Sequence, residues 1–432
     1  MSATLLRGAR VITMTPGRPD VERLDVLVVG DRIVAVGEGL SAAGASRFDL
    51  AGRIVLPGLV NAHLHTWQTP LRSLGADWGL AEYLSRIHQG AAQRFTPDDI
   101  HVATLAGALN QIDCGTTTLG DWSNNLPTPA HTDAAVDAIA RAEIRAVFLH
   151  GGPRRAAEVP HAVAEVDRLL DVARSHRLLT IGMAINGPQA STPEVAVNDF
   201  AAAAERGIIV SMHQSGDRPK PGWDAVRAAG LLGPRTNVVH GAGLTDDWVA
   251  RLVEAGASFT ATPENELSQG HGSPITGRLL RRGAAPSLGT DTEAVVGGAI
   301  MTAARIALAH QRNLDNEPTP RLAAPITSRQ ALTWATTEGA KALGLADRIG
   351  RIEPGMQADL IAVDARRLSL LPAHDAIATA LRAAAGDIEA MMIAGRWRKR
   401  DHRILDVDLD ALGQRLRTTG ERVLEAAERR AR

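Results

Sequence analysis

Two histidines, His63 and His65, stand two residues apart at the end of an apolar run that begins at Ile54 and reads I-V-L-P-G-L-V-N-A-H-L-H. On an extended backbone, side chains two residues apart point to the same side of a strand, so both imidazoles can bind one metal ion. The alternative is that they are ordinary polar residues at a strand end, where imidazole is also common. The choice depends on whether the rest of the chain supplies further ligands.

Short apolar runs alternate with longer helical patterns from residue 54 to residue 291. Eight of the runs are typical of buried strands, namely 54–63, 116–120, 144–150, 178–186, 208–213, 236–240, 257–262 and 285–291. Segments rich in Ala, Leu, Arg and Glu lie between them. Eight alternating units over roughly 250 residues predict an α/β fold with a (β/α)8 TIM-like barrel, in which functional groups lie at the C-terminal ends of the strands.

A polar residue stands where each predicted strand stops. In chain order these residues are His63 with His65, Asp121, His150, Asn186, His213, His240, Glu264 and Asp291. A barrel with a purely structural role has no reason to place imidazole or carboxylate at nearly every strand end on one face. His63, His65, His213 and Asp291 can converge at the barrel mouth as three nitrogens and one oxygen. That ligand set suits zinc or ferrous iron.

The two ends of the chain predict strands outside the barrel. Short strand-like runs separated by turn-forming Pro and Gly occupy residues 1–56, and the pattern returns over 350–405. We therefore expect a composite β-sandwich built from 1–56 and 350–405, with a barrel of 57–349 inserted between them. Apolar residues spaced for one helical face predict a C-terminal helix over 406–432.

Composition excludes several other classes of protein. The 432 residues are 45% hydrophobic and 22% charged, as in ordinary globular proteins, and the net charge of -1 gives no basic field for nucleic acid. No apolar run approaches the length of about 18 residues that a membrane span needs, and no export signal begins the chain. The single cysteine, Cys114, excludes internal disulfides and Cys-rich zinc sites, which fits a reducing cytoplasm.

Five segments together resemble the amidohydrolase superfamily, particularly its cytosine deaminase-like and chlorotriazine hydrolase-like branch of metal-dependent aminohydrolases. They read P-G-L-V-N-A-H-L-H, S-M-H, V-V-H-G, L-G-T-D and I-E-P-G-M-Q-A-D-L-I-A-V-D, and the resemblance covers essentially the whole chain. It implies a distorted barrel with a composite sandwich, and one metal ion held by His63, His65, His213 and Asp291. It also implies that His240 contacts substrate without binding metal, and that Asp291 accepts the proton of the metal-bound water. Homo-oligomers are common among similar proteins, so the resemblance admits a homo-oligomer.

The lysine content favours one metal ion over two. Binuclear members of the superfamily bridge their metals with a carbamylated lysine from the fourth barrel strand, whereas the first lysine here is Lys220. We therefore expect one divalent ion, zinc in preference to iron. Such an ion makes hydroxide available near neutral pH for attack on an sp2 carbon. His240 can donate a hydrogen bond to the negative charge that develops on the substrate. The alternative is that it only supports the residues that contact the metal or the substrate.

One position departs from the pattern of the deaminases. They usually carry a proton-shuttling Glu three residues after the fifth-strand histidine, where this chain has Gly216. A hydrolase that releases a poor amine leaving group needs a general acid, so either another group serves or the leaving group needs less help. The predicted substitutes are Glu266 or His271 in the segment T-P-E-N-E-L-S-Q-G-H-G, with a structural role in that loop as the alternative.

The loop after the first strand is predicted to face the substrate. Trp67 can form an apolar wall, Gln68 offers both a donor and an acceptor, and Arg72 can bind a carboxylate or lie at the surface. Further substrate contacts are predicted at Trp122, His150 and Glu264. His150 can equally be a histidine with its hydrogen bonds satisfied inside the core.

These features predict a hydrolase acting on the C–N bond of a small heterocyclic or amidine-like substrate, of the deaminase or aminohydrolase type, by attack of metal-bound hydroxide. The Gly216 departure keeps two alternatives open: an amide, carbamate or other C–X bond hydrolase, and a lyase or decarboxylase on the same scaffold. A binding protein without activity is a third, against which the complete ligand set argues. The expected partner is a small-molecule substrate, with no nucleic acid and no membrane.

Overall fold

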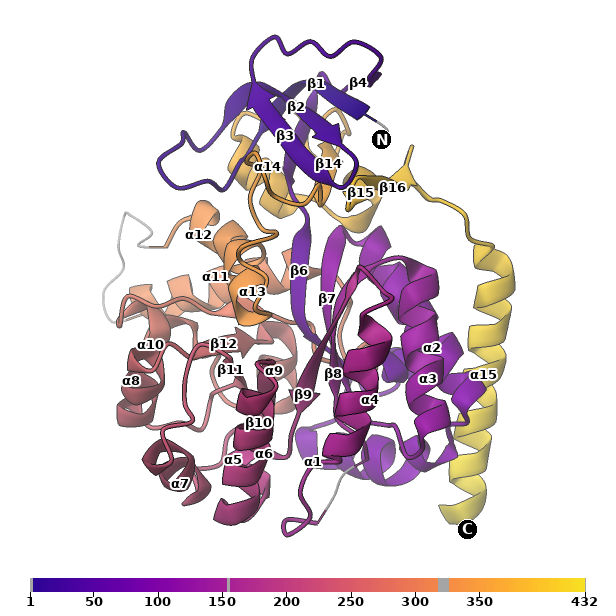
Figure 1. Ribbon diagram of the computed structural model, residues 1–432, viewed down its shortest axis with the longest axis vertical. Coiled ribbons are helices and arrows are strands. Elements are labelled where there is room, and N and C mark those ends of the chain that lie inside the picture. The colour runs from indigo at the N-terminus through magenta and orange to yellow at the C-terminus, as the bar shows by residue number, and fades with distance from the viewer. Residues whose placement is uncertain (1–2, 154–155, 318–325, 432) are drawn as a thin grey trace. The chain divides into compact units, whose positions relative to one another are not determined.

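The computed structural model describes residues 3–153, 156–317 and 326–431 (Figure 1). It divides into two compact units. One comprises residues 62–109, 119–298 and 408–432, and the other comprises residues 1–61, 110–118 and 299–407. The boundaries expected from the sequence, near residues 56, 349 and 405, stay a prediction.

An eight-stranded sheet in sequence order forms the barrel. Its strands are β6 (Leu59–Leu64), β7 (Thr116–Ser123), β8 (Arg145–His150), β9 (Leu179–Ala184), β10 (Val210–Gln214), β11 (Thr236–His240), β12 (Ser258–Ala261) and β13 (Ser287–Leu288). A parallel bridge from Leu64 to Asp291 joins the first strand to the segment after the last one, so the barrel is nearly closed. The predicted α/β barrel is confirmed, and an apolar run predicted as a strand overlaps each of the eight observed strands.

The first predicted run, 54–63, contains two strands. Strand β5 (Arg53–Pro57) pairs antiparallel with β14 (Leu360–Asp364), and β6 begins only at Leu59. Pro57 has no N–H to donate to a ladder, so it occupies the end of β5. Periodicity could not show this division because both strands are buried and apolar.

Helices connect the barrel strands. They include α2 (Pro97–Asp113), α3 (Pro129–Ala142), α4 (Val163–Ala173), α6 (Pro193–Glu205), α7 (Gly222–Ala228), α8 (Asp246–Glu254), α9 (Pro263–Gln269) and α10 (Thr276–Leu280). Helix α8 shows why they form: the Thr245 hydroxyl accepts the Trp248 N–H, and two aspartates stand in the first turn. Trp248, Val249 and Leu252 then bury one face. Helix α15 (Leu409–Ala431), drawn in yellow in Figure 1, belongs to the same unit.

Strands from the two ends of the chain form a second, nine-stranded sheet. In order it runs β17 (Arg403–Ile404), β16 (Arg396–Arg400), β15 (Ile388–Ile393), β14, β5, β1 (Ala3–Val11), β2 (Glu22–Val29) and β3 (Arg32–Gly37), while β4 (Ser46–Asp49) pairs with β1. The antiparallel ladder between β5 and β14 joins the two ends. Buried residues such as Val26, Ile33 and Met392 form its core. The expected pairing of the two chain ends is confirmed.

Four helices and a short 3-10 turn belong to the unit that holds the nine-stranded sheet. They are α11 (Ile300–Asn316), α12 (Ser328–Trp334), α13 (Thr337–Ala342), α14 (Ala376–Arg382) and the 3-10 turn η4 (Ala385–Asp387). Within the described ranges, no helix combines the length and the apolar character needed to cross a bilayer.

Candidate active site

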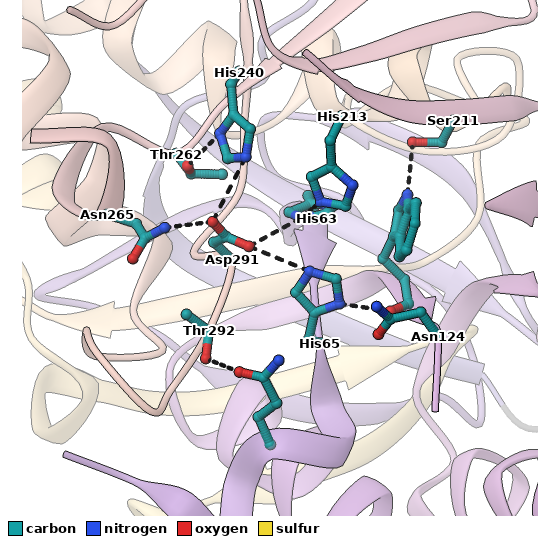
Figure 2. A network of polar contacts seen from close by, with 12 residues as sticks. His63, His65, Asn124, Ser211, His213, His240, Thr262, Asn265, Asp291 and Thr292 are labelled. Carbon is teal, nitrogen blue, oxygen red and sulfur yellow. Dashed lines mark hydrogen bonds and ion pairs between the residues drawn. The ribbon is translucent and has the colours of Figure 1, made fainter. Parts of the chain in front are cut away.

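His63, His65, His213 and Asp291 meet at the C-terminal ends of the barrel strands (Figure 2). One ligand atom from each lies within 4.8 Å of the ligand atoms of the others. His63 Nε2 is 3.1 Å from Asp291 Oδ1 and 3.2 Å from His213 Nε2, and His65 Nε2 is 3.4 Å from the same Asp291 oxygen. Three imidazole nitrogens and a carboxylate oxygen aimed at one point fit a single divalent ion.

The loop after β13 holds Asp291 against the first strand. The N–H groups of Thr290 and Asp291 donate to the His63 carbonyl at 3.1 and 3.0 Å, and the His65 N–H donates to the Asp291 carbonyl at 2.8 Å. Gly289 permits this approach, because a Cβ there would lie 2.7 Å from the His63 carbonyl oxygen. Asp291 takes a left-handed backbone, with φ of 64°, which is costly outside glycine and is often found at functional sites.

Burial and neighbouring charges set the protonation of these four groups. Burial, aided by the charge of His63, lowers the pKa of His65 to about 3, and burial likewise lowers the pKa of His213 well below its usual value. For Asp291, burial opposes ionisation, but the hydrogen bond and charge of His63 outweigh it and hold the pKa well below the usual range. The lowered pKa values favour neutral imidazoles at His65 and His213 and an ionised carboxylate at Asp291, which are the states that metal ligands require.

His240, at the end of β11, lies beside this cluster, and hydrogen bonds at its Nδ1 hold the ring in place. Its Nδ1 is 3.2 Å from Glu266 Oε1 and 3.1 Å from the Thr262 hydroxyl, while its Nε2 is 3.8 Å from Asp291 Oδ2. Burial lowers the pKa of His240, but the hydrogen bond to Glu266 and the charges of Asp291 and Glu266 outweigh it, so the pKa is raised. Asn265 also donates to Asp291 Oδ2.

A cavity of about 290 Å³ opens onto the cluster. Its lining includes His65, Trp122, His213, His240, His271 and Asp291. His271 follows α9, is 4% exposed, and places its ring centroid 4.5 Å from that of His240. Its Nδ1 is 3.1 Å from the hydroxyl of Ser215, which also lines the cavity. Burial, followed by the charge of His240, lowers the pKa of His271 to about 4.

Gly216 and His271 are packed against each other. A Cβ at position 216 would lie 3.0 Å from the His271 carbonyl oxygen, a tighter approach than nine in ten Cβ contacts show. The absence of a side chain at 216 therefore makes room for the loop that carries His271 into the cavity. Gly216, which stands where the deaminases carry Glu, and His271, one of the predicted substitutes for that Glu, are therefore neighbours in the structure.

Comparisons with known proteins identify the family. Residues 54–398 match the model of the Amidohydrolase family. The chain belongs to this family. A 5-methylthioadenosine/S-adenosylhomocysteine deaminase of Symbiobacterium thermophilum is 31% identical over 92% of this chain and 93% of its own, and an 8-oxoguanine deaminase of Pseudomonas aeruginosa is 27% identical over 98% and 100%. These relatives confirm the predicted superfamily and the predicted class of hydrolase acting on C–N bonds.

Solved structures agree with this assignment at the level of the fold. A zinc-bound adenosine deaminase from Xanthomonas campestris superposes with a TM-score of 0.87 at 24% identity, covering 98% of this chain and 99% of that one. A triazine hydrolase variant superposes with a TM-score of 0.86 at 23% identity, covering 97% and 100%.

The structure brings together some of the predicted site residues of this amidohydrolase and separates others. The predicted metal ligands converge, and His240, His271 and Trp122 line the cavity or border it. Glu266 is fully buried behind His240. Among the described residues, the cavity lining does not include Trp67, Gln68, Arg72, His150, Glu264 or Glu266.

The residues outside the lining have other contacts. Trp67 Nε1 donates to Asn124 at 2.7 Å, Arg72 pairs with Glu293 at 2.8 Å, and His150 Nδ1 is 3.0 Å from His161 Nε2. Glu264 lies in the first turn of α9 and is half-buried. Their place in the sequence, next to strand ends, could not show which side of the loop each side chain takes.

Asp121, at the strand end of β7, is fully buried and holds the turn after His65. Its Oδ1 accepts the Thr66 hydroxyl at 2.8 Å and the Thr66 N–H at 3.3 Å. Burial raises the pKa of Asp121 to about 7, although both hydrogen bonds oppose this. The residue thus supports the turn after His65 from outside the cavity.

Sequence reasoning missed His88 and Ser215 in the cavity wall. Tyr83 and His88 come from a segment that opens with the short α1 (Leu80–Tyr83) and continues as a π-helix, η2 (Leu84–Gly90). A π-helix follows neither the helical nor the strand period, so periodicity gave no signal there.

Proposed function

We propose that this amidohydrolase is a mononuclear metal-dependent deaminase or aminohydrolase acting on a small nitrogen heterocycle. The convergence of His63, His65, His213 and Asp291 carries the proposal, because one ion would be held by all four. Zinc is preferred to iron, in line with the zinc-bound relative of the same fold. Such an ion, when bound, lowers the pKa of water and polarises the electrophile.

The substrate class is supported by the relatives and by the cavity. The relatives and structural neighbours are named for their action on 5-methylthioadenosine, S-adenosylhomocysteine, 8-oxoguanine, adenosine or triazine, and each of these contains a nitrogen heterocycle. A cavity of about 290 Å³, lined by Trp122 and by several polar side chains, is of a size to hold such a ring. The single cysteine, Cys114, is compatible with a reducing compartment, and we therefore propose that the protein acts on this small molecule in the cytoplasm.

Asp291 would accept a proton from the attacking water, and His240 would donate a hydrogen bond to the substrate. The Asp291 carboxylate is ionised and faces the cavity, so it can accept a proton from the attacking water. The hydrogen bond to Glu266 at Nδ1 outweighs burial and raises the pKa of His240, while Nε2 points toward Asp291 and can donate there to charge that develops on the substrate. Glu266 thereby acts as a positioning residue.

His271 is the better candidate for the group that carries a proton to the leaving nitrogen. It lines the cavity, whereas Glu266 does not. A lowered pKa keeps its imidazole neutral at pH 7, so it can accept a proton before passing it on. In the overall reaction, one O–H bond of water breaks as the C–O bond forms. The C–N bond then breaks as the leaving nitrogen gains the proton that water lost.

Hydrolysis of another C–X bond remains the second candidate, because position 216 carries no carboxylate. Ammonia release from adenosine, 5-methylthioadenosine, 8-oxoguanine, aminotriazines and hydantoins separates the two. We expect ammonia from at least one heterocycle, and its loss in Asp291→Asn. Hydrolysis without ammonia would favour the second candidate, and full activity of Asp291→Asn would contradict the mechanism.

A further inference from the structure

Tyr83, the last residue of α1, and His88, within the π-helical turn η2 that follows it, form one stretch of the cavity wall. Turns of this kind are rare and are frequent at functional sites. The wider turn brings two residues five apart into contact, so that His88 Nε2 lies 3.3 Å from the Tyr83 hydroxyl oxygen. Tyr83 is only 5% exposed, yet it borders the cavity.

The hydroxyl of Tyr83 is fixed by Gln68. The Tyr83 hydroxyl donates to Gln68 Oε1 at 2.9 Å, and Gln68 Nε2 donates back to the Tyr83 oxygen at 2.7 Å. Thr292, the residue after Asp291, also donates its hydroxyl to Gln68 Oε1, which fixes the orientation of the amide. Burial raises the pKa of Tyr83, so the phenol stays protonated.

This network decides what Tyr83 can offer to a ligand. A phenol has one proton, and here that proton is directed to Gln68, so the oxygen presents only lone pairs elsewhere. His88 Nε2 must then be the donor in its contact with Tyr83. At 3.3 Å that contact is longer than the usual 2.9 to 3.0 Å, whereas the bonds to Gln68 have ordinary lengths.

We propose that the Tyr83 oxygen is a specificity-determining acceptor that selects heterocycles carrying an N–H or amino group besides the group that is hydrolysed. The substrate donor takes the place of His88 on the Tyr83 oxygen. The proposal rests on the proposed function for the identity of the cavity, and it narrows the substrate class to ring systems with a second donor. Gln68, expected from the sequence to touch substrate, acts through Tyr83 instead.

The test compares purine with 2-aminopurine, which differ by one amino group, by isothermal titration calorimetry against the purified holoprotein. We expect the wild type to bind 2-aminopurine at least tenfold more tightly. Tyr83→Phe keeps the ring and loses the oxygen, so that preference should disappear. Gln89→Ala, an exposed position on the same π-helical turn, is the matched control and should keep it.

His88→Ala separates an acceptor role from a structural one. Removing the competing donor should keep or increase the preference for 2-aminopurine. The proposal is overturned if Tyr83→Phe retains the preference, if His88→Ala loses it as Tyr83→Phe does, or if the wild type binds both purines equally or neither. None of these titrations uses ammonia release, so a failure of the proposed function would show separately, as no ammonia from any wild-type assay.

Discussion

Replacing Glu266 by Gln tests the buried pair that holds His240. The change keeps the size of the side chain and removes its charge, so the hydrogen bond from His240 Nδ1, 3.2 Å long, loses its ionic character. A hydrogen bond to a charged group contributes about 1.5 to 3 kcal/mol, roughly 1 kcal/mol more than a neutral one. If that difference is expressed in the transition state, kcat falls about 5-fold, since about 1.4 kcal/mol is a factor of ten.

The pH profile of Glu266→Gln gives a second, independent readout. The Glu266 carboxylate helps to raise the pKa of His240, and an opposite charge at this distance typically shifts a pKa by about one unit or more. Without it, His240 loses its proton at lower pH, so the alkaline limb of kcat should move to lower pH. Steady-state rates from pH 5 to 10 measure both effects.

Ser268→Ala is the control for this prediction. Ser268 lies on the same helix, α9, is exposed, and bonds only to the backbone carbonyl of Glu264 among the described contacts. Its variant should match the wild type in rate and in pH profile. An unchanged kcat together with an unchanged alkaline limb in Glu266→Gln would refute the role assigned to Glu266.

Three further predictions concern the support of the site. Gly216→Ala should lower kcat and destabilise the loop of His271 by about 1 kcal/mol, seen in urea unfolding, because its Cβ meets the His271 carbonyl at 3.0 Å; wild-type stability and rate would contradict this. Arg72→Ala should lower the free energy of unfolding by about 1 kcal/mol, since it removes the ion pair with the buried Glu293 while Arg72 itself is partly solvated; no loss of stability would count against that pair. Asp121 has a pKa raised to about 7, so it makes the fold less stable as pH rises from about 4 to 7, and Asp121→Asn should remove that part of the pH slope of the unfolding free energy; an identical slope in both proteins would exclude it.

The barrel strands and the metal ligands were predictable because both leave local signals. Buried parallel strands read as apolar runs, and the C-terminal ends of such strands share one face, so His213 and Asp291 could be placed beside His63 without a structure. The approach of Gly289 to His63 and the left-handed backbone of Asp291 complete that placement. Those features depend on contacts between distant segments and have no local signal.

The substrate-facing wall was harder to predict. Trp67 and Gln68 follow His65 closely in sequence, but both are buried outside the cavity lining, while Tyr83 lines it from the end of α1 and His88 from the π-helical turn. The side of a loop that faces a cavity is set by packing in three dimensions. For the same reason the sequence could not choose between Glu266 and His271. They lie five residues apart, but Glu266 is buried against His240 Nδ1 whereas His271 lines the cavity.

The most direct test of the central claim is the metal content and ligand set of the purified protein. X-ray absorption at the metal edge, with elemental analysis of the same sample, should show one divalent ion per chain, bound by three imidazole nitrogens and at least one oxygen. His213→Ala should lose that ion while keeping the fold by circular dichroism. Two tightly held ions per chain, sulfur ligation, or full retention of the ion by His213→Ala would contradict the account.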